Sequence, residues 1–123
     1  MAPYHQIYRV ALVLLLAAFS GCGGNQAKVV TELQKGNDFL DREDYDAAIA
    51  CYTEAIRLDP NYALVYNNRG WAYSWKGEDD KAIKDLTEAI RLKPDFADAY
   101  GNRGMVYERK GDLDKAKSLG LDP

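Results

Sequence analysis

Very few side chains in this sequence could serve as a nucleophile, a proton acceptor or a metal ligand. The chain has one histidine, His5, and two cysteines, Cys22 and Cys51. His5 lies in an N-terminal segment with the layout of a secretory signal, which is removed from a mature protein. We therefore expect the mature chain to build no Ser-His-Asp or Cys-His catalytic group and no histidine-based metal site.

Carboxylates are abundant, with 19 Asp and Glu residues, and glycoside hydrolysis needs a pair of them. The adjacent pair Asp79-Asp80, however, stands where we expect a helix to begin, and acidic side chains there favour the positive end of the helix dipole. Basic and acidic residues are interspersed and the net charge is −3, so no basic patch exists to bind a nucleic acid. The sequence predicts no enzyme activity, no cofactor and no nucleic-acid partner.

The first 21 residues have the three-part layout of a signal peptide. Arg9 precedes an apolar run of ten residues, Val10 to Phe19, and the small residues Ser20 and Gly21 follow it. A membrane-spanning helix needs about 20 apolar residues, so this run is too short to be a good anchor. We expect residues 1–21 to be a signal peptide.

The segment Phe19-Ser20-Gly21-Cys22 resembles the bacterial lipobox, with Phe19 where Leu is usual. The resemblance implies a diacylglyceryl group on Cys22, with further acyl chains such as palmitate, followed by a lipidated linker over residues 22–28. By the same resemblance, Gly23 in place of Asp implies the outer membrane, facing the periplasm, more than the inner membrane. The alternative is a secreted protein cleaved near Ala18 or Ser20. Either way Cys51 has no partner for an internal disulfide, and we expect it to be a small buried side chain on a helix.

Three segments of the sequence repeat one another at an offset of 34 residues. The segment from Thr53 to Leu58 recurs almost unchanged from Thr87 to Leu92. Single positions recur as well, and these are Gly36, Gly70 and Gly104; Phe39, Tyr73 and Tyr107; and Ala48, Ala82 and Ala116. The repeats cover residues 29–62 and 63–96, with an incomplete third over 97–123. A fixed period of this size is typical of solenoid proteins.

Each repeat has the pattern of two helices. In the second repeat, a helix from Leu64 to Lys76 should end at Gly77, because the residue past a helix C-terminus often adopts a left-handed backbone. Asp79 or Asp80 should start the next helix, and Pro94 should end it. We expect Gly70 and Ala82 to lie where the two helices approach closely.

This pattern resembles the tetratricopeptide repeat. The matching positions include Tyr66 and Tyr100, the glycines and alanines above, and the prolines Pro60 and Pro94. The resemblance implies an all-α fold, an α-solenoid of helix-turn-helix repeats with about two and a half repeats. In the first repeat Glu32 stands where the family has an aromatic residue, and a terminal repeat, whose outer face meets water, tolerates this change. In the third repeat the closing segment Leu121-Asp122-Pro123, which corresponds to Leu58-Asp59-Pro60, comes five residues earlier than in the other repeats. Gly120 also weakens the second helix of this repeat, so we expect that helix to be a stub.

The resemblance also implies that the first helices line a concave face that binds an extended peptide or a partner helix. Trp71 and Trp75 lie four residues apart on that face, where aromatic anchors often dominate an interface. Packing of the two rings against the adjacent repeats is the alternative. The candidate groove residues are Asn37, Asn67, Asn68, Trp71, Trp75, Asn102, Met105 and Arg109.

Some members of this family grip a peptide's C-terminal carboxylate with lysine, arginine and asparagine side chains. This chain keeps the two asparagines, Asn37 and Asn68, but has Leu33, Asp98 and Asn102 where the cations would stand. The charge-assisted hydrogen bonds of such a clamp are therefore missing.

We expect a non-catalytic protein-interaction scaffold, anchored by lipid in the bacterial envelope, that binds a protein or peptide partner of an envelope assembly. The alternative is a truncated or self-associating structural protein. In that case the exposed side of the third repeat, near Tyr100, Met105 and Tyr107, would make a homodimer, because about three repeats are needed for a stable core.

Overall fold

The computed structural model describes residues 24–119, which form helices joined by short turns. The signal-peptide and lipidation predictions for residues 1–21 and Cys22 lie outside these residues. The described helices are residues 24–41, α2 (Tyr45–Leu58), α3 (Ala63–Trp75), α4 (Asp79–Leu92) and α5 (Ala97–Ser118). The predicted all-α fold of about two and a half repeats is confirmed.

The two turns inside the hairpins have the same hydrogen-bond pattern. At the end of α3, the Glu78 N–H donates to the Tyr73 carbonyl (3.0 Å) and the Gly77 N–H donates to the Ser74 carbonyl (3.0 Å). Gly77 has φ +77°, as predicted, and Glu43 occupies the same place in the first hairpin with φ 60°. The left-handed residue turns the chain so that these two N–H groups reach carbonyls in the last turn of the helix, which would otherwise be unpaired.

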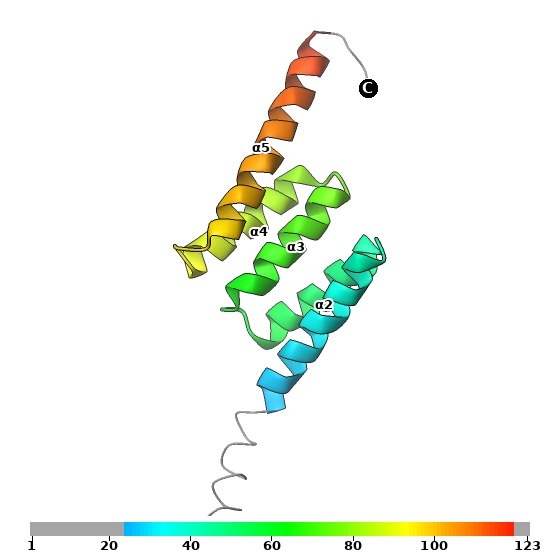
Figure 1. Cartoon of the computed structure of the whole chain (residues 1–123), viewed down its shortest axis with the longest axis vertical. Coiled ribbons are helices and arrows are strands. Elements are labelled where there is room, and N and C mark those ends of the chain that lie inside the picture. The colour runs from blue at the N-terminus through cyan, green and yellow to red at the C-terminus, as the bar shows by residue number, and fades with distance from the viewer. Residues whose placement is uncertain (1–23, 120–123) are drawn as a thin grey trace, which may run out of the picture.

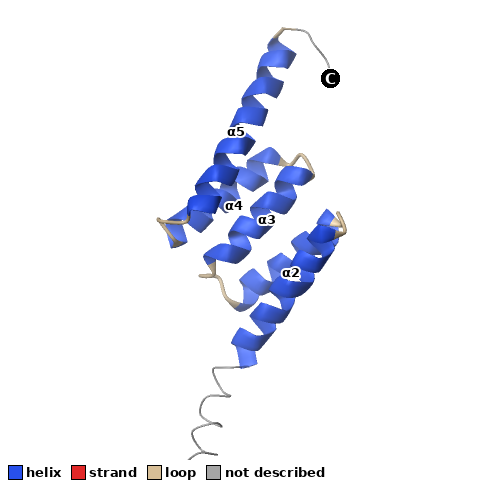
Figure 2. Ribbon diagram, viewed as in Figure 1, coloured by secondary structure: helices blue, strands red, loops and turns tan. Residues whose placement is uncertain are grey.

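The helices form two layers (Figures 1 and 2). The helix 24–41, α3 and α5 lie side by side in one layer, and α2 and α4 lie behind them in the other. The core accordingly falls into two clusters, one per interface between repeats. The first contains Val29, Leu33, Ala48, Tyr52, Ala55, Val65 and Ala72; the second contains Ala82, Leu86, Ala89, Ala99 and Val106.

A glycine in each of the two hairpins lets the paired helices approach closely. A Cβ on Gly70 would lie 2.9 Å from Cγ of Leu86 and 3.2 Å from the carbonyl oxygen of Ala82. Gly36 meets the ring of Tyr52 even more closely. Leu86 and Tyr52 are both fully buried, so each glycine forms the notch that receives the large side chain of the second helix.

Contacts between successive repeats recur at the same 34-residue offset. The Tyr66 hydroxyl donates to the Pro60 carbonyl (3.0 Å), and the Tyr100 hydroxyl donates to the Pro94 carbonyl (3.0 Å). Two ion pairs also recur between corresponding positions, Lys76 with Asp46 and Lys110 with Asp80. The helix α5 therefore docks on the second repeat in the way that α3 docks on the first.

Up to residue 119, where the described part of the chain stops, the third repeat forms no separate stub helix, and that prediction was wrong. The helix α5 runs unbroken from Ala97 to Ser118, through Gly111. At the 34-residue offset, Gly120 stands where the second repeat has Leu86. A second helix would therefore have no large side chain to place against Gly104. Continuing α5 keeps its backbone hydrogen bonds without that burial.

Alanine at the equivalent glycines should change stability in opposite directions. Gly104→Ala should raise the free energy of unfolding by about 0.5–1 kcal/mol, because a Cβ there meets no described atom within 4 Å and glycine is a poor helix former. Gly70→Ala should lower it by roughly 1–3 kcal/mol through overpacking against Leu86. Urea denaturation followed by circular dichroism measures both values. A Gly70→Ala variant as stable as Gly104→Ala would contradict the close approach of α3 and α4.

Candidate functional site

Four asparagines join the three helices of the groove layer through hydrogen bonds. Nδ2 of Asn68 on α3 donates to Oδ1 of Asn37 on the helix 24–41 (3.1 Å). Nδ2 of Asn102 on α5 donates to Oδ1 of Asn67 (3.0 Å), whose own Nδ2 donates to Oδ1 of Asn68 (3.3 Å). This asparagine network (Asn37, Asn67, Asn68 and Asn102) runs across all three helices.

The network also connects to the core. The hydroxyl of the fully buried Tyr52 donates to Oδ1 of Asn37 (2.7 Å), so this oxygen accepts two hydrogen bonds. Asn67 is only 7% exposed and its amide is already engaged at both ends. Asn37 Nδ2 and Asn102 Oδ1 make no hydrogen bond within residues 24–119. The free hydrogen-bonding capacity of the network thus lies at Asn37 and Asn102.

Three aromatic rings meet at the end of the groove where α3 stops. The ring of Trp75 stacks on Tyr45 of α2, with centroids 6.4 Å apart and planes 6° apart. Trp71 meets Trp75 edge to face, with centroids 5.5 Å apart. Trp75 remains 56% exposed, whereas Trp71 is half-buried. The pair thus packs partly against the preceding repeat and still presents one indole to solvent.

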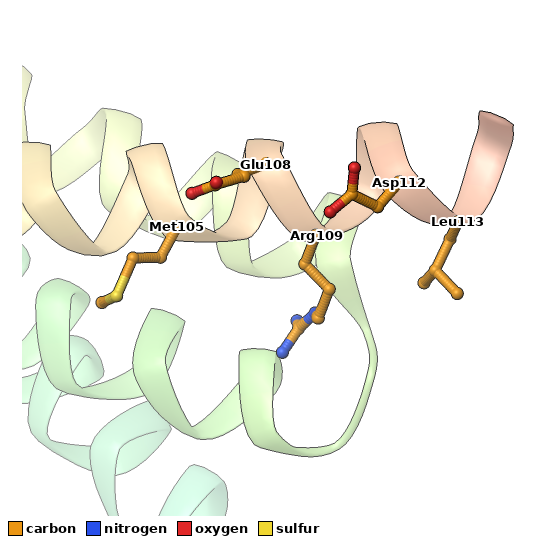
Figure 3. A pocket seen from close by; sticks show the side chains of 5 residues that line it. All are labelled: Met105, Glu108, Arg109, Asp112 and Leu113. Carbon is orange, nitrogen blue, oxygen red and sulfur yellow. The ribbon is translucent and has the colours of Figure 1, made fainter. Parts of the chain in front are cut away.

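The groove continues onto one face of α5 (Figure 3). Met105, Glu108, Arg109, Asp112 and Leu113 line an open hollow of about 380 Å³ there. Met105 is 50% exposed and points toward the neighbouring helices. Glu108 and Asp112 give the hollow an acidic edge.

Arg109 points toward the turn between α3 and α4, where it is held by several groups. Its Nη2 donates to the Ser74 carbonyl (2.9 Å) and hydroxyl (3.2 Å), and it forms an ion pair with Asp79. The guanidinium therefore ties α5 to the second repeat. Arg109, which the sequence placed in the groove, thus uses its Nη2 atom to hold the fold together.

The positions of a carboxylate clamp hold no cation. Leu33 is buried in the first core cluster at 8% exposure, Asp98 is exposed, and Asn102 donates to Asn67. A peptide C-terminus would therefore meet a leucine, a carboxylate and an amide at these three places.

The described residues offer little to covalent or metal chemistry. Cys51 is half-buried, and burial, followed by the negative charge of Glu32, raises the pKa of its thiol. The thiol is therefore kept in its less reactive protonated form. Within residues 24–119, no group of three or more His, Cys, Asp or Glu side chains could hold a metal ion, and no helix is long and apolar enough to cross a membrane.

Sequence reasoning missed Tyr45, which supports the exposed indole of Trp75. It also missed the buried ion pair of Arg69 with Asp85, in which Nε and Nη2 donate to the two carboxylate oxygens at 2.7 and 2.8 Å. Tyr45 has no counterpart at the repeat offset, since Asp79 stands there. The ion pair could have been suspected from one signal in the sequence, which is the recurrence of Arg69 as Arg103 at the repeat offset.

The chain matches the family model described as TPR repeat over residues 36–77 and 72–111. Human small glutamine-rich tetratricopeptide repeat-containing protein beta is 52% identical over 40 residues, which cover 32% of this chain and 13% of that protein. The Arabidopsis thaliana Hsp70-Hsp90 organizing protein 1 is 46% identical over 43 residues, or 35% of this chain and 8% of that protein. The chain thus spans a small fraction of these relatives.

Solved structures match over more of the chain. The second TPR of Spaghetti (RPAP3), bound to the HSP90 peptide SRMEEVD, has a TM-score of 0.68 and 34% identity, and the match covers 81% of this chain and 99% of that one. MamA has a TM-score of 0.66 and 34% identity, with 73% of this chain and 53% of that chain covered.

Stability should fall at high pH through Tyr52. Burial raises the pKa of its hydroxyl well above the usual value of about 10, and the charge of Asp41 adds to this effect. The folded protein therefore keeps a proton that the unfolded chain loses above about pH 10, so the free energy of unfolding decreases there by up to about 1.4 kcal/mol per pH unit. Urea denaturation between pH 8 and 11.5 should show a shallower decrease for Tyr52→Phe. Equal slopes in the two proteins would contradict the burial of this hydroxyl.

Proposed function

The chain belongs to the tetratricopeptide repeat family, and we propose that it is a non-catalytic module that holds an extended peptide or partner helix in its groove. The observation that carries the proposal is the juxtaposition of the asparagine network with a half-exposed tryptophan on the same layer of helices. The asparagine network could recognise a peptide backbone, and the tryptophan could anchor a side chain of that peptide.

The asparagine network suits a backbone more than a particular side chain. Asn37 has a free donor and Asn102 a free acceptor, on the two outer helices of the groove. Their partners within the network hold both amides in place before a ligand arrives, which lowers the entropy lost on binding. A peptide that lies across the helices could bond to both ends.

Affinity should come from the exposed apolar side chains that follow the network asparagines on α3 and α5. Trp75 is 56% exposed and Met105 is 50% exposed, and both can bury surface against an aromatic or aliphatic side chain of the ligand. The stack of Trp75 on Tyr45 restrains the indole, so little rotamer freedom remains to be lost.

The charge of the groove does not complement the acidic peptides to which some solved relatives are bound. The solved relatives include domains bound to SRMEEVD and to the HSP70 peptide SGPTIEEVD. Here Asp98, Glu108 and Asp112 are acidic, and Arg109 is engaged by Ser74 and Asp79. We infer that the ligand is uncharged or basic where it meets α5, and that its C-terminal carboxylate is not required.

Selection of peptides from a random phage-displayed library on the immobilised chain tests this function. We expect enriched peptides to carry an aromatic or large aliphatic residue and to bind equally well when their C-terminus is amidated. Trp75→Ala should weaken them by about 2 kcal/mol, or roughly 30-fold, as measured by fluorescence anisotropy.

Tyr107→Ala is the matched control, because Tyr107 is 53% exposed, almost as much as Trp75, and does not line the groove. It should leave peptide affinity unchanged. Failure to enrich any saturable ligand, or equal losses for the two variants, would rule out the groove as the binding site.

We also propose that lipid on Cys22 attaches the module to the bacterial envelope, with the outer membrane favoured. The support is the lipobox-like segment that ends at Cys22, two residues before the described helix begins. Metabolic labelling with an alkyne fatty acid in a Gram-negative host should tag the full chain and its Cys51→Ser variant but not Cys22→Ser. A label that survives Cys22→Ser, or no label in the unchanged chain, would refute the anchor.

A further inference from the structure

The interface between α3 and α4 shows which side chains the second helix of a repeat contributes to the surface of the first helix. Gly70 receives Leu86 in its notch, and Arg69 binds Asp85 through two hydrogen bonds. Nη1 of Arg69 also donates to the Thr53 hydroxyl of the preceding repeat (3.1 Å). Leu86 is fully buried and Asp85 is 5% exposed, so both side chains depend on α3 for their environment.

The helix α5 carries the same surface without a second helix. Gly104 corresponds to Gly70, yet a Cβ there meets no described atom within 4 Å. Arg103 corresponds to Arg69 and donates to the Thr87 hydroxyl (3.2 Å) in the same way, but no described carboxylate forms an ion pair with it. Tyr107, which flanks the notch, is 53% exposed.

The described residues that follow Gly104 do not cover this notch. Residues 113–118, which correspond to the start of α4, continue α5 beyond the ends of α3 and α4 (Figure 1). At the offset of Asp85 and Leu86 the sequence has Leu119 and Gly120. A leucine thus stands at the position of the carboxylate, and a glycine stands at the position of the leucine that fills the notch.

We propose that the face of α5 around Gly104 and Arg103 binds an amphipathic helix of a partner protein. That helix has α4-like chemistry: a small residue, then an acidic and a large apolar residue three and four positions later, as in Ala82, Asp85 and Leu86. Its leucine fills the notch at Gly104 and its carboxylate pairs with Arg103. This docking surface is separate from the groove, because Gly104 and Met105 lie on different faces of α5.

A second copy of the chain is a poorer occupant than such a partner. The helix that carries the matching residues, α4, already buries Ala82, Asp85 and Leu86 in its own hairpin. Two copies that met through α5 would bring two empty notches together and place two Arg103 side chains near the same axis. Charge complementarity therefore favours an acidic helix over a symmetric dimer.

The test uses a fluorescein-labelled peptide of residues 78–93, the sequence of α4, titrated with the full chain. A lactam between Asp80 and Lys84, both exposed in α4, holds the peptide helical so that weak helix formation does not obscure the result. We expect saturable binding by anisotropy. Gly104→Ala should weaken it at least tenfold, although the same substitution stabilises the chain itself.

Gly101→Ala is the matched control, because Gly101 is also an exposed glycine of α5 with no described atom within 4 Å of a Cβ, and it corresponds to the groove residue Asn67. It should leave affinity unchanged. The charge pairing is tested by a double-mutant cycle: Asp85→Asn in the peptide should weaken binding to the unchanged chain and have no effect on Arg103→Met.

Three results would overturn the proposal. They are the absence of saturable binding, equal affinity for the unchanged chain and Gly104→Ala, and a dimer in sedimentation equilibrium that Gly104→Ala abolishes. The second result would place the peptide on another surface, such as that of a displaced α4. The third would make a second copy the occupant.

Discussion

The fit of one large side chain into a glycine notch is the contact on which each repeat depends. Gly36 receives Tyr52 and Gly70 receives Leu86, and in both hairpins the absence of a Cβ brings the helix axes close enough to bury the second helix. The hairpins then stack through buried alanines and valines, which produces two small core clusters in place of one large core. Stability is therefore divided among neighbouring repeats, as in other solenoids.

The stacking also determines which polar groups remain for a ligand. Holding three first helices in one layer uses the asparagine network, the pairs of Lys76 and Lys110 with acids of the preceding repeat, and the bonds of Arg109. These polar side chains are thus engaged before a ligand arrives. The groove keeps a few half-free amides and exposed apolar groups, which suits recognition of a peptide backbone with an apolar anchor.

The third repeat shows how far the same interactions extend without a second helix. The side of α5 that faces α4 is fully packed, with Ala99 at 0% and Val106 at 1% exposure. On the other side of α5, the notch at Gly104 is open, because no described residue places a large side chain in it. The two faces of α5 thus differ because one finds its partners on the preceding repeat, whereas the notch at Gly104 needs a large side chain from a second helix.

The sequence by itself determined the helical repeat, its period, the glycine notches, the left-handed turn at Gly77 and the helix ends near the prolines, because each follows from local backbone preferences or from residues that recur in register. Only the tertiary structure decided the course of α5 through Gly111, the burial of Asn67, the use of Arg109 in the fold and the stack of Trp75 on Tyr45. A glycine can end a helix or lie within one, and an asparagine or arginine can face a ligand or a neighbouring helix. The choice depends on which groups the other helices bring within reach, and that information is not local in the sequence.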